Sequence, residues 1–161
     1  MQVFIGLGSN LDDPAAQVQS ALQALNDLPD SQLIQSSSLY KSPPMGPQDQ
    51  PDYINAVAEI ETALSAHELL GQLQALEQAH GRIRRRHWGE RTLDLDILLY
   101  GQLQITDATL TIPHPGIALR PFVLYPLAEV APNLSVPGLG NVAELCLHCP
   151  TDGLEKMEET Q

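Results

Sequence analysis

The basic residues of this chain are concentrated in one short segment. Five of its eight Lys and Arg residues lie within positions 82–91, although the whole chain has 20 acidic residues and a net charge of -12. Random placement would scatter them, so the cluster indicates a binding site for a polyanion, because guanidinium groups clamp phosphate oxygens. The alternative is a loop whose arginines form surface ion pairs, each worth about 0–1 kcal/mol.

Two carboxylates follow the arginines directly. Residues 93–100 have the clearest strand pattern of the chain, and Gly101 begins the turn that should end the strand. Alternate side chains of a strand point to opposite faces, so Asp94 and Asp96 share a face, with their Cα atoms about 6–7 Å apart. Oxygen ligands at that spacing suit Mg²⁺, which shares its coordination with substrate phosphates. The segment therefore predicts a metal-assisted phosphate site.

Other sequence features raise three alternative classes of protein. An Asp-x-Asp pair also forms the metal-diphosphate clamp of nucleotide-sugar transferases, for which this chain is short. A nucleotide-binding regulatory domain is the non-enzymatic alternative. Gly6 and Gly8 suggest a dinucleotide-binding fingerprint, but Leu11 occupies the place of its third glycine, which excludes this class.

These residues must be positioned by a small set of alternating strands and helices. Ser65 and Glu68 form a capping box that predicts the start of a helix. Four prolines between residues 43 and 51 predict a long loop without regular structure, and a turn is expected at 8–10. The expected elements are strands over 3–7, 33–40, 53–61 and 93–100, and helices over 14–25 and 65–80.

The composition is typical of one globular domain. The chain has 161 residues, 43% of them apolar and 17% charged, enough to bury roughly two-thirds of its unfolded surface around one core. We therefore expect a single domain over 1–161 whose tail frays from about residue 151. The negative charge disfavours nucleic acid and anionic membranes as partners. The N-terminal residues show neither a signal peptide nor a spanning segment, so we expect a cytoplasmic protein.

The two cysteines, Cys146 and Cys149, are too few for a disulfide scaffold. Their Cys-Leu-His-Cys spacing leaves three interpretations open, namely half-buried thiols on a terminal helix, a redox pair, or half of a metal site. No second Cys/His pair with zinc spacing occurs in the chain, which favours the first interpretation.

Several motifs, in their order along the chain, resemble the 6-hydroxymethyl-7,8-dihydropterin pyrophosphokinase family of folate synthesis. They are Gly8-Ser9-Asn10, the stretch 43–56, Gly81-Arg82, the stretch 88–97, Pro113-His114, Arg120 and Phe122. The resemblance covers about residues 2–135. It implies a monomer with an α+β, ferredoxin-like fold, in which a mainly antiparallel sheet is flanked by helices on both faces.

The resemblance also implies a reaction, the transfer of the β,γ-pyrophosphoryl group of ATP to the hydroxymethyl oxygen of 6-hydroxymethyl-7,8-dihydropterin, with release of AMP. Asp94 and Asp96 would hold two Mg²⁺ ions, and the catalytic residues would be Arg82, Arg91 and Trp88. The ATP site would comprise Gln74, Glu77, Arg82, Trp88, Arg91, Ile97, His114 and Arg120. The pterin site would comprise Ser42, Pro43, Met45, Tyr53, Asn55, Trp88, Asp94 and Phe122.

Within the implied pterin site, Tyr53 and Phe122 would sandwich the flat ring. The Asn55 amide carries a donor and an acceptor, which match the mixed edge of the pterin pyrimidine ring. Without the resemblance, Tyr53 and Phe122 would be interpreted as core aromatics, and His114 as a residue that fixes its loop by a hydrogen bond.

Overall fold

Two helices separate groups of strands along the first two-thirds of the chain. The computed structural model describes residues 1–10, 13–43, 52–80, 93–151 and 153–157. Its elements are β1 (Gln2–Ser9), α1 (Pro14–Asn26), β2 (Ser31–Ser36), β3 (Tyr40–Ser42), β4 (Tyr53–Thr62), α2 (Ala66–Ala79), β5 (Asp94–Tyr100), β6 (Ile105–Thr106), β7 (Thr111–Ile112), a 3₁₀ turn (Ile117–Leu119), α3 (Pro121–Val130), β8 (Ser135–Val136), β9 (Gly140–Asn141), α4 (Val142–Leu147) and β10 (Glu155–Lys156).

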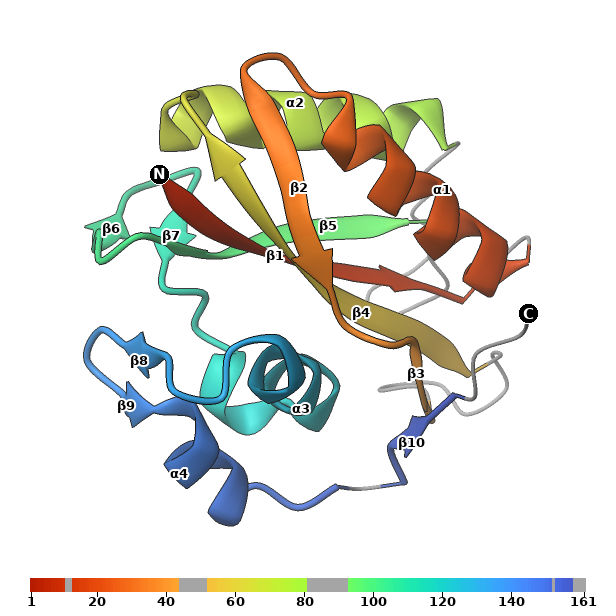
Figure 1. The fold of residues 1–161 in the computed structure, drawn as a ribbon, viewed down its shortest axis with the longest axis vertical. Helices are drawn as coiled ribbons and strands as arrows, with labels where there is room; N and C mark the ends of the chain where they lie inside the picture. The colour runs from red at the N-terminus through yellow and green to blue at the C-terminus, as the bar shows by residue number, and fades with distance from the viewer. Residues whose placement is uncertain (11–12, 44–51, 81–92, 152, 158–161) are drawn as a thin grey trace.

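A six-stranded sheet forms the centre of the molecule (Figure 1). The strand order is β10-β3-β4-β1-β5. The sixth strand, β2, also pairs with β4, along a part of β4 that does not pair with β3. Every strand pair among the described residues of this sheet is antiparallel. Because α1 connects β1 to β2 and α2 connects β4 to β5, this is the predicted ferredoxin-like α+β arrangement.

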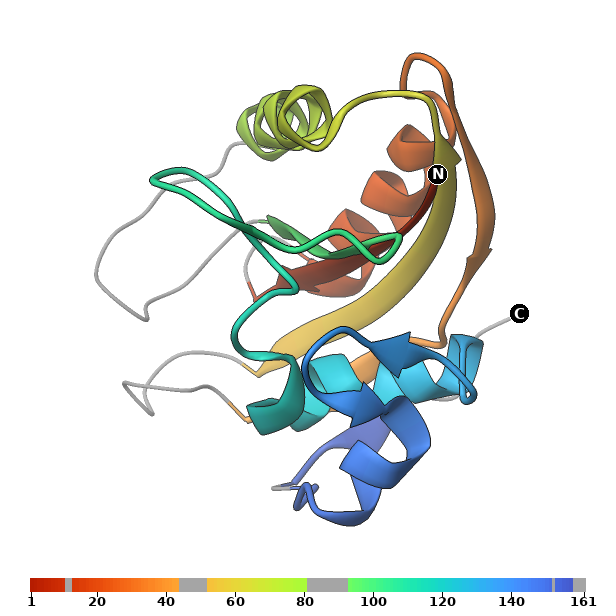
Figure 2. The same cartoon turned by 90° about the vertical axis from the view of Figure 1, so that its left-hand side faces the viewer.

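Helices cover both faces of the sheet, as predicted (Figure 2). Alternation along β1 sends Val3, Ile5 and Leu7 into a core shared with α1 and α2. Phe4 belongs to a second core, on the opposite face, built with residues of α3 and α4. Within the described residues, no helix is long and apolar enough to cross a membrane.

The start of α2 follows the capping box in the sequence. The Ser65 hydroxyl accepts a hydrogen bond from the Glu68 amide at 3.1 Å, and the Glu68 carboxylate accepts one from the Ser65 amide at 2.9 Å. The two bonds satisfy two amides that a helix start otherwise leaves open. The predicted helix over 65–80 is confirmed.

The predicted strand over 33–40 is wrong in one respect, because the chain forms two strands there, β2 and β3. Ser37 lies between them, and its backbone amide donates to the Val57 carbonyl at 2.8 Å. Its hydroxyl, and not its carbonyl, accepts from the Val57 amide at 2.9 Å. A side chain thus replaces the backbone in the ladder, which interrupts the strand beside the middle of β4.

The described part of the tail is more ordered than predicted. Residues 155–156 form β10, which pairs with β3, and the Met157 amide donates to the Leu39 carbonyl at 2.8 Å. Cys146 is half-buried on α4, and Cys149 is buried just beyond the helix. The two cysteines are not joined by a disulfide, and only Cys146 lies on the helix where the favoured interpretation placed both.

A polar clamp joins α3 to β3. The Glu129 carboxylate on α3 accepts hydrogen bonds from the Tyr40 hydroxyl at 2.6 Å and from the Ser38 amide at 3.0 Å. Burial and then the bond to Glu129 raise the pKa of Tyr40, so the hydroxyl remains protonated and donates. Lys156 of β10 lies 3.8 Å from the same carboxylate. The clamp fixes the helix that carries Phe122 relative to the strand that carries Ser42.

We expect Tyr40→Phe to lower the free energy of unfolding by about 1–2 kcal/mol, because it removes a hydrogen bond to a charged acceptor. Urea unfolding of Tyr40→Phe, Glu129→Gln and the double variant measures the coupling between the two side chains. A coupling energy near zero would show that the Tyr40–Glu129 bond does not contribute to the clamp.

Candidate active site

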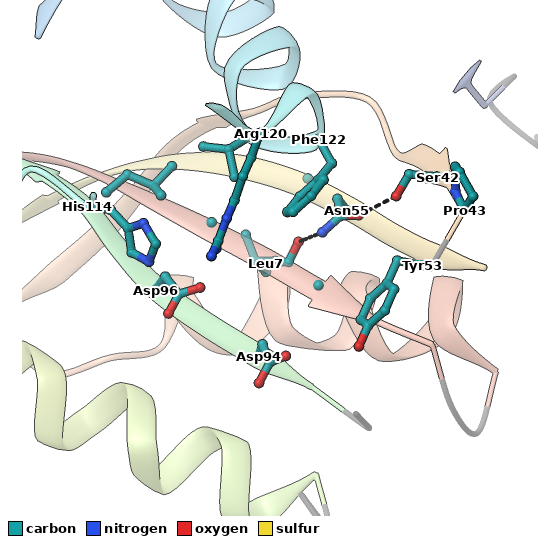
Figure 3. Close-up of a pocket in the computed structure, with 15 residues that line it drawn as sticks. Leu7, Ser42, Pro43, Tyr53, Asn55, Asp94, Asp96, His114, Arg120 and Phe122 are labelled. Atoms are coloured by element: carbon teal, nitrogen blue, oxygen red, sulfur yellow. Dashed lines mark hydrogen bonds between the residues drawn. The ribbon is translucent and has the colours of Figure 1, made fainter. Parts of the chain in front are cut away.

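One pocket lies where β1, β4 and β5 meet the start of α3 (Figure 3). It gathers nine of the predicted site residues from five separate segments of the chain, namely Ser42, Pro43, Tyr53, Asn55, Asp94, Asp96, His114, Arg120 and Phe122. The remaining lining residues are Gly6, Leu7, Gly8, Ala56, Leu98 and Val123. The site therefore depends on the tertiary fold and not on any one motif.

Two glycines of β1 form the floor of the pocket. Gly6 pairs with Asp96 and Gly8 pairs with Asp94 across the β1–β5 ladder. A Cβ at Gly8 would lie 2.8 Å from the Nδ2 atom of Asn55, closer than such atoms approach. The missing side chain at Gly8 thus makes room for Asn55, its partner on β4. The turn expected at 8–10 begins later than predicted, because Gly8 and Ser9 still belong to β1.

Asp94 and Asp96 lie on the pocket face of β5, as the strand periodicity predicts (Figure 3). Leu95 and Ile97 point to the opposite face and are buried in the core under α1 and α2. Asp94 is half-buried and Asp96 is exposed. Two carboxylates therefore project into the open space above the glycine floor.

The Asn55 amide is held in one orientation. Its Nδ2 atom donates to the Leu7 carbonyl at 3.5 Å, and its Oδ1 atom lies 3.4 Å from the Ser42 hydroxyl, which donates to it. Both contacts are long, and both are buried. They assign the oxygen to the Ser42 side and leave one N–H and one lone pair for a ligand.

Two aromatic rings lie on either side of Asn55 in Figure 3. Tyr53 begins β4, and Phe122 is the second residue of α3, which starts with Pro121 as many helices do. Both rings are half-buried pocket residues, and Phe122 also packs against the second core. The Arg120 guanidinium lies 6.0 Å from the centre of the Phe122 ring, at the outer range of a cation-π contact.

His114 is fixed as a neutral donor. Its Nδ1 atom accepts a hydrogen bond from the Gly116 amide at 3.0 Å, so the proton of the neutral ring is on Nε2. Burial lowers the pKa of His114, the Arg120 guanidinium lowers it further, and the Asp96 carboxylate opposes both. His114 therefore fixes its loop with one nitrogen and also lines the pocket.

Other predicted residues lie away from the pocket lining. Gln74 is exposed on α2, Ile97 is buried in the core, and the buried carboxylate of Glu77 accepts a hydrogen bond from the Leu95 amide at 2.8 Å. Four predicted residues lie outside the part of the chain that the structure describes, namely Met45, Arg82, Trp88 and Arg91.

The sequence interpretation missed three contributors to the pocket. The carbonyl of Leu7 and the bare Cα of Gly8 orient Asn55. Gly116 donates to His114, and a Cβ at this position would lie 2.6 Å from the Nε atom of Arg120. The paired glycines of β1 and the Pro-His-Pro-Gly sequence were visible signals, but only the strand register and the loop geometry give them a role.

The sequence matches one protein family over most of its length. Residues 4–132 match the family described as 7,8-dihydro-6-hydroxymethylpterin-pyrophosphokinase (HPPK). The 2-amino-4-hydroxy-6-hydroxymethyldihydropteridine pyrophosphokinase of Haemophilus influenzae is 54% identical over 142 residues, which are 88% of this chain and 89% of that protein. The protein of the same name from Pseudomonas aeruginosa is 46% identical over 156 residues, which are 97% of this chain and 96% of that protein.

The fold is also found in solved structures. The crystal structure of wild-type Plasmodium falciparum HPPK-DHPS with STZ-DHP has a TM-score of 0.74 and 12% sequence identity to this chain. The similarity covers 91% of this chain and 43% of that one, so this chain spans less than half of the Plasmodium protein. At this identity the similarity shows the fold alone.

Proposed function

This chain belongs to the 7,8-dihydro-6-hydroxymethylpterin-pyrophosphokinase family, and from that premise we propose that the pocket on β1, β4 and β5 is its active site. The family's reaction transfers the pyrophosphoryl group of ATP to the hydroxymethyl group of the dihydropterin, which gives the pterin diphosphate and AMP. The nucleophile belongs to the substrate. The task of the protein is therefore to position two substrates and to stabilise charge on the phosphates.

The pterin binds at the Asn55 end of the pocket. The fixed amide offers one N–H and one lone pair side by side, which complement the 2-amino and 4-oxo edge of the ring. Tyr53 and Phe122 contact the two faces of the ring, and stacking of this kind is worth about 0.5–1.5 kcal/mol beyond burial. Pro43 and, by the sequence prediction, Met45 complete this end.

The triphosphate binds over Asp94 and Asp96, together with two Mg²⁺ ions. The donor set fits such ions, because two carboxylates share one face above a floor without side chains. Among the described residues no group of three or more His, Cys, Asp or Glu side chains forms a complete protein cage. This also suits Mg²⁺, which takes its other ligands from water and substrate phosphates. When bound, the ions neutralise phosphate charge and align the reacting oxygens.

The nucleotide extends from the carboxylates toward His114 and Arg120. The Nε2 proton of His114 and the Arg120 guanidinium are donors suited to phosphate oxygens. By the sequence prediction, Gln74, Glu77 and Ile97 contribute to the nucleotide site. Arg82, Arg91 and Trp88 are predicted to stabilise and enclose the moving phosphates.

We propose a monomeric enzyme with small molecules as its partners, as the family resemblance implies. The net charge of -12 supports the absence of nucleic-acid partners. We place the enzyme in the cytoplasm, where ATP is available.

The observation that carries this proposal is the oriented Asn55 amide in the same pocket as the two carboxylates. Calorimetric titration with hydroxymethyl dihydropterin, and with the analogue that has a 2-oxo group in place of the 2-amino group, tests it. We expect the analogue to bind at least about tenfold more weakly, because it leaves a buried group of Asn55 without a partner. Equal affinities would refute the assignment of the pterin to Asn55.

We expect Gly116→Ala to weaken binding of a non-hydrolysable ATP analogue by several-fold, because the new Cβ displaces the Arg120 side chain. Gly71→Ala is the matched control, since a Cβ at this α2 position meets nothing within 4 Å. The control should raise the free energy of unfolding by about 0.5–1 kcal/mol and leave nucleotide binding unchanged. Calorimetry in Mg²⁺ compares them, and equal nucleotide affinities for the two variants would exclude a role of Arg120 in the site.

A further inference from the structure

A buried carboxylate supports the strand that carries both metal-site residues. Glu77 on α2 is only 8% exposed, and its Oε2 atom accepts a hydrogen bond from the backbone amide of Leu95 at 2.8 Å. Leu95 lies between Asp94 and Asp96 in the sequence, on the opposite face of β5. Glu77 therefore contacts the β5 backbone between the two aspartates, from outside the pocket.

The geometry of the sheet explains why this amide needs a partner. In the described part of the sheet β5 pairs with β1 alone, so its other edge is open. Amides of an antiparallel edge strand point alternately toward the neighbour and away from it. The Leu95 amide points away from β1 and would be buried without an acceptor if Glu77 were absent, which is energetically costly. Glu77 supplies the acceptor that a further strand would otherwise supply.

The position of Glu77 on α2 is unusual for a charged residue. The other buried residues of this helix are Ala66, Leu69 and Leu73, and Glu77 follows them at the spacing that continues their apolar stripe. A leucine here would pack on the core but could not accept a hydrogen bond. A carboxylate at a core position is costly unless it is hydrogen-bonded, and the bond to the Leu95 amide is one such hydrogen bond.

We propose that Glu77 is a positioning residue for Asp94 and Asp96. By holding the Leu95 amide, it fixes the edge of β5 and so the direction in which the two neighbouring carboxylates project toward the metal ions. The inference rests on the proposed function of the pocket, and it gives Glu77 an indirect role in place of the direct nucleotide contact that the family resemblance implies. Partners that orient metal ligands in this indirect way typically change metal affinity by about 10–100-fold when they are replaced.

Two conservative variants separate the effect of side-chain length from the effect of charge. Glu77→Gln keeps the length of the side chain and an acceptor oxygen but loses the charge. Glu77→Asp keeps the charge but is shorter by one methylene, so it cannot hold the amide in the same position. Gln78→Asp, at the adjacent exposed position of α2, measures the cost of an aspartate in this turn of the helix.

The readouts are Mn²⁺ binding by electron paramagnetic resonance, with a non-hydrolysable ATP analogue present, and hydrogen exchange of the Leu95 amide by NMR. We expect Glu77→Asp to bind Mn²⁺ about tenfold more weakly than the wild type and to exchange the Leu95 amide faster. Glu77→Gln and Gln78→Asp should remain within about threefold of the wild type in metal affinity, and saturating metal should restore nucleotide affinity to Glu77→Asp.

Three results would overturn the inference. The first is wild-type metal affinity in Glu77→Asp, and the second is equal impairment of Glu77→Gln and Glu77→Asp, which would show that a neutral acceptor of full length does not suffice. The third is a loss of nucleotide affinity that saturating metal does not reduce, since this would make Glu77 a nucleotide contact. A wild-type protein that binds no Mn²⁺ would instead refute the proposed metal site itself, and the inference with it.

Discussion

Replacement of Asp96 by Asn should lower kcat for pyrophosphoryl transfer by about 10³-fold, and Asp94→Asn should do the same. Each change removes one negative charge from the end of the pocket proposed to bind the phosphates, while it preserves the shape of the side chain. The lost stabilisation is several kcal/mol and acts on charge that develops in the transition state. Steady-state measurement of AMP release over a range of Mg²⁺ concentrations gives kcat and the metal dependence together.

Asp27→Asn is the matched control for the metal variants. Asp27 is exposed at the end of α1, away from the pocket lining, and the same chemical change there should leave kcat unaltered. The three variants should unfold within about 0.5 kcal/mol of the wild type, as surface changes usually do. If Asp94→Asn or Asp96→Asn kept wild-type turnover at limiting Mg²⁺, the two carboxylates would not be the metal ligands.

Gly8→Ala should abolish most of the pterin affinity and lower ATP affinity by a smaller factor, because Gly8 also belongs to the floor beside Asp94. The added Cβ would lie 2.8 Å from the Nδ2 atom of Asn55, so the amide must leave the orientation that Leu7 and Ser42 hold. Loss of two hydrogen bonds to the ring, at about 0.5–1.5 kcal/mol each, corresponds to an affinity loss of about tenfold or more. Titration with each ligand alone measures the two affinities separately.

Asn55→Ala provides the comparison for Gly8→Ala. It removes the amide directly, so the two variants should lose pterin affinity by similar factors, and the double variant should lose little more than either one. Gly71→Ala again controls for a glycine replacement in open space. Additive losses in the double variant would mean that Gly8 does not act through Asn55.

Local patterns in the sequence predicted the elements that carry the proposed metal site. A period of two placed Asp94 and Asp96 on one face of β5, and a capping box placed the start of α2 at Ser65. Both signals depend on interactions within a few residues, which the sequence displays directly. The pterin end depended on the family resemblance, because Ser42, Asn55 and Phe122 lie on three segments that no local rule brings together.

The errors arose where one element determines the structure of another. Ser37 replaces a backbone carbonyl at Val57, a residue 20 positions away, and so divides one predicted strand into β2 and β3. Gly8 belongs to a strand because Asn55 pairs with it, although a glycine before Ser9 is typical of a turn. The bond from Leu95 to Glu77 requires α2 to lie against the open edge of β5, which is a property of the complete fold.

The most direct test of the whole account is phosphorus NMR of the products formed from ATP, Mg²⁺ and 6-hydroxymethyl-7,8-dihydropterin. We expect AMP and a pterin that carries both the β and the γ phosphorus of ATP, in equal amounts, with no ADP. Omission of the pterin should leave ATP intact, because the nucleophile is the substrate's own hydroxyl. Formation of ADP with a pterin monophosphate, or release of free pyrophosphate, would contradict pyrophosphoryl transfer in this pocket.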